Sequence, residues 1–446
     1  MTDSMTERYN RELAGTDLVA EGFSGLTTLG YRYSPRPMFV PQSEMDAFAA
    51  DVARAVDLVF DLPDRLFDGD LVRFHHALGT DPGRLLGMAD TSAPPRFGRV
   101  DAYHDGTGFK VLEFNVGSDV GGQDWVGAVP RALLGVPAFG SFAERNALAY
   151  TDTVTVVAEL LRELGVAATG GRDPVVAMVG LPGDVDPGPW LPFQLMLREA
   201  GFECHFCGLT DLRVRGGRVH LGDTPVDVVY RLFQTDHVIG DPDAVEIVEH
   251  LTRAHAEGDL VFFTPMRTEV FQNKSCMALL SDPRVALSAD ERALVDRILP
   301  WTRALGPTAL DDRDLVEQCR ERREHLVLKP NSLYGGRGIT AGWEVDDAEW
   351  WRALRAAAPG GAIVQERVVP RVEPLVNPAT GESEPWEGCW GLYYTPAGGY
   401  AGGGCRLLPH GSARISEADG DREIPGTSIF DSYRAGVFLY PDEAVR

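Results

Sequence analysis

Lysine is nearly missing from this chain of 446 residues. It occurs only at Lys110, Lys274 and Lys329, and arginine supplies every other basic residue. A GC-rich genome favours arginine codons, which explains the depletion but not the positions of the three lysines that remain. Each of them is therefore a candidate for a specific role.

Positive charge is also scarce overall, because 42 Lys and Arg stand against 66 Asp and Glu, a net charge of −24. Phosphate backbones require clustered positive charge, so nucleic acid and anionic membrane surfaces are poor candidate partners. No apolar run approaches the ~20 residues of a membrane helix. The N-terminus also lacks the basic and apolar regions of a signal peptide. We therefore expect a cytoplasmic protein.

The six cysteines are too few and too irregularly spaced for a disulfide scaffold. Cys204 and Cys207 have C-x-x-C spacing, but no second pair or suitably spaced histidine follows them. A structural zinc site needs four ligands. We therefore favour small buried residues over a metal or redox role.

The apolar periodicity predicts helices over 43–60 and 70–78. Helices and strands then alternate between about 150 and 265, which predicts a mainly parallel sheet. A further helix over 288–304 is interrupted by Pro300, and short strands dominate from 326 onward.

The strongest local motif is the segment 326–339. A short apolar strand carries Lys329, and the loop after it contains Gly335, Gly336 and Gly338. Glycines let the backbone approach a polyphosphate, and a lysine adds a compact positive charge. The lysine precedes the glycines, so this is not a Walker A loop. The alternative is a glycine-rich surface hairpin with a chance lysine.

A second motif combines Arg99 and Asp101 with Glu113 and Asn115 around a turn at 105–108, a pattern typical of a hairpin. The two carboxylates and the amide are hard oxygen ligands of the kind that Mg²⁺ prefers. An odd-length loop would place Arg99 opposite Glu113 and the three ligands on one face. A four-residue loop would separate Asp101 from the other two. The alternative is an exposed hairpin with a cross-strand Arg–Glu pair.

Two other basic residues have either a functional role or an ordinary role at the protein surface. Lys274 opens an apolar helix, where a solvated lysine would be unremarkable except for the rarity of lysine in this chain. Arg406 follows the glycines 402–404 and is either a phosphate contact or a surface residue.

The strand 362–369 is broken by Gln365 and Glu366. As a sheet edge, it could offer backbone groups to an adenine and a carboxylate to a ribose. It could equally be an edge strand that carries charge for solubility.

Three further residues leave their roles open. Asp119 and Gln123 either touch a substrate or belong to a glycine-rich loop, and Arg231 either binds a carboxylate or pairs with an aspartate.

Together, Arg99-x-Asp101 and Glu113-x-Asn115 ahead of the lysine–glycine strand and loop resemble a circularly permuted ATP-grasp ligase. The similarity is to the synthetase domain of glutathionylspermidine synthase and related bacterial carboxylate–amine ligases. It covers roughly 95–125 and 225–410. In ordinary ATP-grasp enzymes the metal segment lies near the C-terminal end, whereas here it lies near residue 100.

The resemblance implies an α/β (α+β) permuted ATP-grasp fold with an inserted α/β substrate domain. Residues 1–150 would supply N-terminal helices and the Mg²⁺-binding hairpin, 151–268 the substrate domain, and 269–446 the lid and nucleotide-binding domain.

The resemblance also implies ATP- and Mg²⁺-dependent amide formation through an acyl phosphate, releasing ADP and phosphate. The substrates would be a small carboxylate and an amine, such as an amino acid, peptide or polyamine; no oligomeric state is indicated. The implied metal ligands are Asp101, Glu113 and Asn115. The implied catalytic residues are Arg99 and Arg406, and the implied ATP-binding residues are Lys274, Lys329, Tyr334, Gly335, Gly336, Gly338, Gln365 and Glu366.

Two other functions remain as alternatives: a nucleotide-binding sensor or scaffold without ligase turnover, and an ATP-grasp phosphotransferase. A sensor would be expected to have lost part of the site, so the complete set of residues argues against it.

Overall fold

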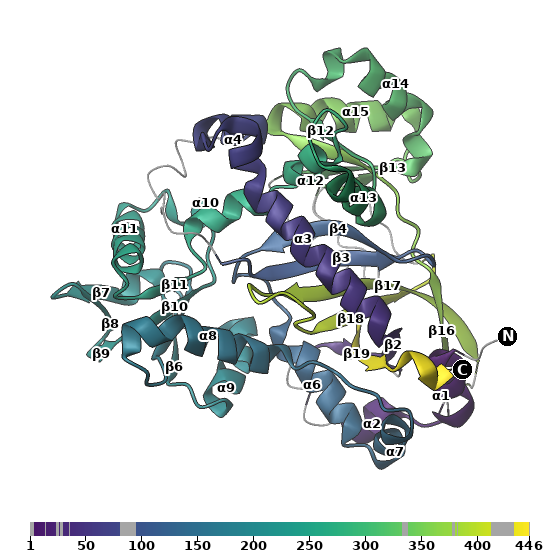
Figure 1. Ribbon diagram of the computed structural model, residues 1–446, viewed down its shortest axis with the longest axis horizontal. Coiled ribbons are helices and arrows are strands. Elements are labelled where there is room, and N and C mark those ends of the chain that lie inside the picture. Colours follow the sequence, from purple (N-terminus) through teal and green to yellow (C-terminus); the bar gives the residue numbers. More distant parts are fainter. Residues whose placement is uncertain are drawn as a thin grey trace.

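The computed structural model describes residues 4–13, 15–23, 26, 30–34, 36–80, 95–331, 338–376, 380, 382–411 and 432–445. Their strands form sheets of eight, four, four and three strands, with helices packed on and between them (Figure 1). The chain therefore has a mixed α/β fold, as the sequence predicts.

The eight-stranded sheet takes strands from both ends of the described chain. Its order is β1-β19-β18-β17-β3-β4, with β2 paired to β19 and β16 paired to β17. The strands are β1 (Arg32–Tyr33), β2 (Met38–Pro41), β3 (Gly98–His104), β4 (Phe109–Val116), β16 (Val372–Val376), β17 (Ser383–Tyr394), β18 (Gly403–Pro409) and β19 (Tyr433–Tyr440).

The middle of the chain forms a parallel sheet of order β11-β10-β5-β6, as predicted (Figure 1, left). Its elements are α8 (Thr153–Thr169), β5 (Val176–Gly180), α9 (Leu191–Glu199), β6 (Cys204–Gly208), β10 (Val228–Arg231), α10 (Thr235–Val238), α11 (Pro242–Glu257) and β11 (Val261–Phe263). A small antiparallel sheet, not predicted, is formed by β7 (Leu212–Arg215), β8 (Arg218–Leu221) and β9 (Thr224–Pro225).

Cys204 and Cys207 both lie in β6 and are buried. They pack in different core clusters because residues three apart in a strand point to opposite faces. Burial raises the pKa of each thiol to about 12. The prediction of small buried residues is confirmed.

A four-stranded antiparallel sheet of order β12-β15-β13-β14 lies at the top of Figure 1, beside α14 and α15. Its elements are β12 (Thr302–Leu305), α14 (Arg313–Glu321), β13 (Leu326–Pro330), β14 (Thr340–Ala341), α15 (Asp347–Ala357) and β15 (Ala362–Glu366).

Two predictions are wrong in this region. The helix predicted over 288–304 is α13 (Ala289–Ile298), and the residues after Pro300 form β12 instead, because they pair with β15. The capping box of Ser288 and Glu291 is present at the start of α13. The strand predicted as an edge is the interior strand β15, which pairs with β12 on one side and β13 on the other.

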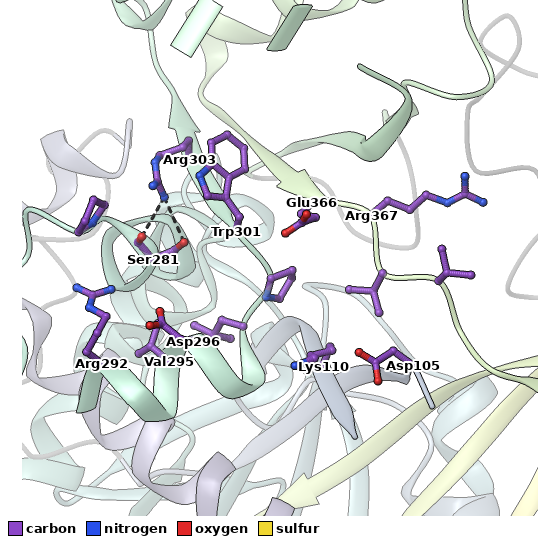
Figure 2. A pocket seen from close by; sticks show the side chains of 15 residues that line it. Asp105, Lys110, Ser281, Arg292, Val295, Asp296, Trp301, Arg303, Glu366 and Arg367 are labelled. Atoms are coloured by element: carbon purple, nitrogen blue, oxygen red, sulfur yellow. Dashed lines mark hydrogen bonds between the residues drawn. The ribbon is translucent and has the colours of Figure 1, made fainter. Parts of the chain in front are cut away.

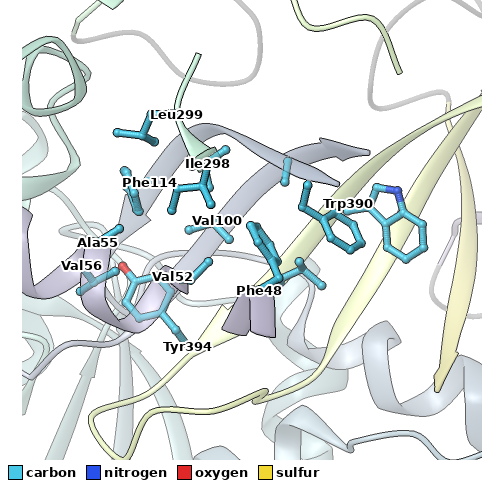
Figure 3. Close-up of a cluster of buried hydrophobic side chains, with 14 of the residues drawn as sticks. Phe48, Val52, Ala55, Val56, Val100, Phe114, Ile298, Leu299, Trp390 and Tyr394 are labelled. Carbon is cyan, nitrogen blue, oxygen red and sulfur yellow. The ribbon is translucent and has the colours of Figure 1, made fainter. Parts of the chain in front are cut away.

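The main core lies between one face of the eight-stranded sheet and two helices. The long helix α3 (Gln42–Phe67) crosses this sheet and buries Phe48, Val52 and Val56 against it (Figures 1 and 3). Val100, Phe114 and Trp390 from the sheet and Ile298 from α13 complete this part of the core (Figure 3). Burying each such side chain contributes about 1.5–3 kcal/mol. One face of the sheet thus packs in this core, and the candidate site residues of β3 and β4 project from the other.

The remaining helices are α1 (Met5–Leu13), α2 (Leu18–Gly22), α4 (Leu71–Ala77), α6 (Gln123–Leu134), α7 (Pro137–Arg145) and α12 (Ser275–Ser281), with the 3₁₀ helix η4 (Met266–Gln272) before α12. In the described part of the chain, no single helix is long and apolar enough to cross a membrane. Only α6 and α7, joined by a 93° bend, meet that test together.

Candidate functional site

The polar face of the eight-stranded sheet carries five of the thirteen predicted site residues, which are Arg99, Asp101, Glu113, Asn115 and Arg406. In the antiparallel register, Arg99 lies opposite Asn115 and Asp101 lies opposite Glu113. Directly opposed residues point to the same face, so these four side chains lie together. Their neighbours Val100 and Phe114 point into the core on the other face. The three candidate ligands share a face, as expected for an odd-length loop, but the pairing of Arg99 with Glu113 expected for that loop is wrong.

The loop of this hairpin does not have the odd length that was expected for this arrangement. Four residues, 105–108, separate the strands, and four would have put Asp101 and Glu113 on opposite faces. A β-bulge corrects the alternation, since the register passes from Ala102–Val111 to Asp101–Glu113 and skips Leu112. One inserted residue moves the side chains that follow it to the opposite face of the sheet.

Two arginines hold Asp101. Arg99 donates from Nε to Oδ1 at 2.7 Å and from Nη2 to Oδ2 at 3.2 Å, and Arg406 Nη2 lies 2.9 Å from Oδ2. Arg406 reaches Asp101 from β18 because β17, the strand between them, places Cys389 and Gly391 on the same face. Burial opposes ionisation of Asp101, but the two guanidinium groups outweigh it and lower the pKa of Asp101 to about 2.

Gly391 is a position beside the candidate site that the sequence interpretation did not assign a role. It lies opposite Asp101 in β17, and a Cβ there would come within 2.9 Å of Arg99 Cδ and 3.2 Å of Arg99 Nε. A side chain would therefore displace the arginine that contacts Asp101. The sequence does little to single it out, since the same strand contains a second glycine, Gly388.

Lys274 lies at the N-terminal cap of α12, which confirms the predicted helix start. It is buried, and its Nζ lies 2.9 Å from Glu113 Oε1. A solvated terminal lysine is therefore excluded. Asn115 donates its amide Nδ2 to the Arg99 carbonyl at 3.2 Å, so its Oδ1 is the atom that remains to accept a ligand.

Lys329 lies beside these residues too, but it belongs to the four-stranded antiparallel sheet that contains β13. It is buried in β13, and its Nζ donates to Gln365 Oε1 at 2.7 Å and to the Leu112 carbonyl at 3.2 Å. That carbonyl belongs to the residue skipped at the bulge, so the bulge also positions this lysine. Burial lowers the pKa of Lys329 to about 8; Glu113 opposes the shift and Lys274 adds to it. Arg99, Lys274, Lys329 and Arg406 are called the cation cluster below.

Gln365 and Glu366, the two residues of β15 proposed for nucleotide binding, place their side chains on opposite faces of the sheet. Gln365 is buried beside Lys329 and donates to Thr302 Oγ1 at 3.2 Å. Glu366 lies opposite Leu326, whose side chain packs in the core with α14 and α15, and its carboxylate pairs with Arg322 at 2.9 Å. The structure thus brings Gln365, but not the Glu366 carboxylate, to the cation cluster.

The glycine-rich loop is only partly covered. Tyr334, Gly335 and Gly336 lie outside the described residues. Asn331, at the start of the loop, donates to Ser275 Oγ at 2.8 Å and so ties the end of β13 to α12. Gly338, at the other end, has φ +70°, a conformation that favours glycine.

The donor set of Asp101, Glu113 and Asn115 fits Mg²⁺, which binds carboxylate and amide oxygens together with substrate phosphates. The three side chains lie on one face of two neighbouring strands. Among the described residues, no group of three or more His, Cys, Asp or Glu side chains is arranged to hold a metal. A site here would therefore use the amide of Asn115 as its third protein ligand.

A cleft of about 650 Å³ lies at the C-terminal end of β15, where Glu366 and the three residues after it line one side. Figure 2 shows Trp301 and Arg303 above it, Lys110 and Asp105 below it, and Glu366 and Arg367 beside it. None of its lining residues belongs to the cation cluster. Of the predicted site residues, Glu366 lines this cleft.

Arg231 is not available to a substrate. It is fully buried, and its Nη1 lies 2.9 Å from Glu269 Oε1 in η4. The expectation of an acidic partner is met, although the closest carboxylate is this glutamate and Asp119 is farther away at 3.9 Å.

No protein-family model and no curated protein sequence matches the chain at a significant level. Among solved structures, the chain is similar to a glutathione synthetase-like effector from Globodera pallida, with a TM-score of 0.58 and 15% identity over 98% of both chains. It also matches a candidate gamma-glutamylcysteine synthetase from Methylobacillus flagellatus KT, with a TM-score of 0.46 and 14% identity over 89% of each chain. The first similarity establishes a shared fold; the second is too low to support an argument.

Proposed function

We propose that this chain is an ATP- and Mg²⁺-dependent ligase that joins a small carboxylate to an amine through an acyl phosphate. The observation that supports this most strongly is the cation cluster. Two of the three lysines in the chain are buried there, and together with two partly exposed arginines they lie around two carboxylates and an amide. Four cations against two carboxylates leave an excess of positive charge, in a protein with a net charge of −24.

ATP and a substrate carboxylate are both negatively charged and repel each other. The excess positive charge of the cation cluster would offset this repulsion. Lys274 and Lys329 would bind the ATP phosphates, and Gln365 would orient Lys329. Arg99 and Arg406 would contact the carboxylate and the transferred phosphoryl group. Phosphoryl transfer depends mainly on positioning and on positive charge placed where negative charge develops.

The reaction is balanced in two steps. The γ-phosphorus of ATP forms a bond to a carboxylate oxygen of the acid, and its bond to the β,γ-bridging oxygen breaks, so that ADP leaves. The amine nitrogen then attacks the acyl carbon, the C–O bond to phosphate breaks, and the nitrogen loses a proton. Inorganic phosphate and an amide are released.

Asp101, Glu113 and Asn115 would hold Mg²⁺, which supplies charge neutralisation to the phosphates when bound. In the structure, Arg99 and Arg406 contact the carboxylate of Asp101, and Lys274 contacts that of Glu113. Metal binding would release these cations toward the phosphates and the substrate.

The fold shared with the glutathione synthetase-like effector supports this assignment. We further propose that the fold is a permuted ATP-grasp fold, because strands from both ends of the described chain share the sheet that carries the metal ligands. The loop with Tyr334, Gly335, Gly336 and Gly338 would close over the phosphates, since water would otherwise hydrolyse the acyl phosphate.

The test is to incubate the purified protein with MgATP and pools of amino acids, peptides, polyamines and other small acids and amines. ADP and phosphate are measured, and products are identified by mass spectrometry. The proposal predicts a product with the mass of two components minus water, in a 1:1 ratio to ADP. AMP in place of ADP would contradict the acyl-phosphate route, and a stable phosphorylated acid would identify a phosphotransferase.

A further inference from the structure

A second polar cluster lies where the parallel sheet meets the loop after β4. It contains Asp119 from this loop, Gln123 from the start of α6, Tyr230 from the end of β10, and Gln234 just after β10. Asp119 Oδ2 accepts from Gln234 Nε2 at 2.8 Å, and Gln123 Nε2 donates to the Tyr230 hydroxyl at 3.2 Å. These four residues are called the acceptor cluster.

The arginine beside this cluster has no hydrogen-bonding capacity left. A guanidinium carries five N–H groups. The five N–H groups of Arg231 are directed at the carbonyls of Thr264 and Phe233, the carboxylate of Glu269, and the hydroxyls of Thr264 and Thr268. Arg231 therefore cannot bind a substrate carboxylate here without breaking these contacts.

The charges around Arg231 do not balance. Two carboxylates, Asp119 and Glu269, face its single guanidinium. Burial raises the pKa of Glu269 to about 7; Arg231 opposes this shift and the charge of Asp119 adds to it. An additional positive charge near Asp119 would relieve this repulsion.

The unused polar atoms point to the same conclusion. Asp119 Oδ1 and Gln123 Oε1 are both buried, and no described group donates a hydrogen bond to either. The Gln123 residue is 1% exposed and the Asp119 side chain 9% exposed. Buried polar atoms are normally hydrogen-bonded. Both unused atoms are acceptors, so the missing partner must be a donor.

The acceptor cluster is also next to the cation cluster. The carbonyl of Gly121, in the same loop, accepts from Arg99 Nη1 at 2.6 Å and from the Tyr393 hydroxyl at 2.7 Å. A group held by Asp119 and Gln123 would therefore lie beside the arginine assigned to the activated carboxylate.

We propose that Asp119 and Gln123 bind a protonated primary amine of the acceptor substrate, and that this amine has no carboxylate beside it. The proposal rests on the function proposed above, and it selects simple aliphatic amines over α-amino acids. A carboxylate next to the amine would add a third negative charge where Arg231 is already committed.

The test is calorimetric titration without ATP, using n-butylamine, L-norvaline and 1-butanol as probes. L-norvaline is n-butylamine with a carboxylate beside the amine, and 1-butanol is its neutral counterpart. We expect saturable binding of n-butylamine alone, and at least tenfold weaker binding to Asp119→Asn and Gln123→Met. Equal binding of n-butylamine to Asp119→Asn, no binding to the wild type, or tighter binding of L-norvaline would overturn the proposal.

Two further measurements separate this proposal from general effects. Asp243→Asn removes an exposed carboxylate from α11 in the same part of the chain and should bind n-butylamine within twofold of the wild type. Asp119→Asn should unfold at the same temperature as the wild type or higher, because it removes a repulsive charge. A lower temperature would contradict the charge argument.

Lys329→Ala should bind n-butylamine like the wild type, because Lys329 is outside the acceptor cluster. Amine binding in a protein that never consumes ATP would therefore refute only the proposed function. ATP-dependent turnover with an unchanged Asp119→Asn variant would refute only the amine site.

Discussion

The cation cluster, which contacts the loop after β4 through Arg99, and the acceptor cluster, which includes Asp119 of that loop, have opposite charge balances. In the cation cluster, four basic side chains surround Asp101 and Glu113. Beside the acceptor cluster, two carboxylates share the one guanidinium of Arg231. A single short segment thus lies between a place suited to anions and a place suited to a cation, which is the combination that a carboxylate–amine ligase requires.

The two clusters also show how a structural arginine differs from the two arginines proposed to bind substrate. The side chain of Arg231 is 0% exposed and its hydrogen bonds are all used within the protein. The side chains of Arg99 and Arg406 are 17% and 15% exposed, and both contact Asp101, a candidate metal ligand. Burial and saturated hydrogen bonds therefore indicate a structural role, whereas contacts that a ligand can replace indicate a binding role.

The largest expected effect is on stability, in Arg231→Lys. Lysine keeps the positive charge but has three N–H donors where Arg231 uses five, so at least two buried acceptors would lose their partner. Each buried group left unsatisfied costs about 1–3 kcal/mol, which gives a total of about 2–6 kcal/mol. We expect a loss of this size in denaturant unfolding, with MgATP affinity retained in the folded fraction. An unchanged unfolding free energy would show that Arg231 is not structural.

The next effect is on turnover, in Gly391→Ala. The added Cβ would displace Arg99 from Asp101, and a misplacement of about 1 Å near the reacting groups costs about 100-fold in rate. The unfolding free energy should change much less, since Arg99 is a flexible side chain. Gly399→Ala is a poor control because that glycine has φ +77°, whereas Gly306→Ala introduces a Cβ with nothing within 4 Å. Equal turnover in Gly391→Ala and Gly306→Ala would contradict the role of Arg99.

The smallest effect is a pH dependence. Burial lowers the pKa of Lys329 to about 8, so the free protein loses this positive charge as the pH rises through 8. We expect kcat/KM for ATP to fall above pH 8 by about tenfold per unit. Lys329→Arg, which stays protonated, should lack this step whatever its absolute rate. A step that persists in Lys329→Arg would belong to another group.

The lowered pKa of Lys329 also predicts how the free energy of unfolding changes with pH. The pKa of Lys329 in the folded state lies below its unfolded value of about 10.4. Its charge therefore destabilises the fold below pH 8, and this cost is relieved between pH 8 and about 10.4. Lys329→Met should lack that contribution to the pH dependence of the unfolding free energy.

The sequence predicted the parts of the molecule that depend on local pattern. The helix α3 and the alternation of helices and parallel strands follow from apolar periodicity. The two lysines stood out because the chain has so few, and the structure places both beside Glu113 or its neighbour Leu112.

What could not be predicted depends on contacts between distant segments. The bulge at Leu112 is fixed by packing of Val111 and Phe114 against the core, not by a turn motif. The interior position of β15 requires β12, which the sequence interpretation assigned to a helix. The saturation of Arg231 depends on residues more than 30 positions away, such as Thr264 and Glu269.

The most direct test of the central claim is MgATP binding by calorimetry to the three lysine variants. Lys274→Ala and Lys329→Ala remove charge from the cation cluster, whereas Lys110→Ala removes the third lysine, which donates to the Arg297 carbonyl outside it. We predict at least 100-fold weaker binding for the first two variants, with their folds intact, and binding within twofold of the wild type for Lys110→Ala. MgATP affinity that is equal in Lys329→Ala and Lys110→Ala would show that this cluster is not the nucleotide site.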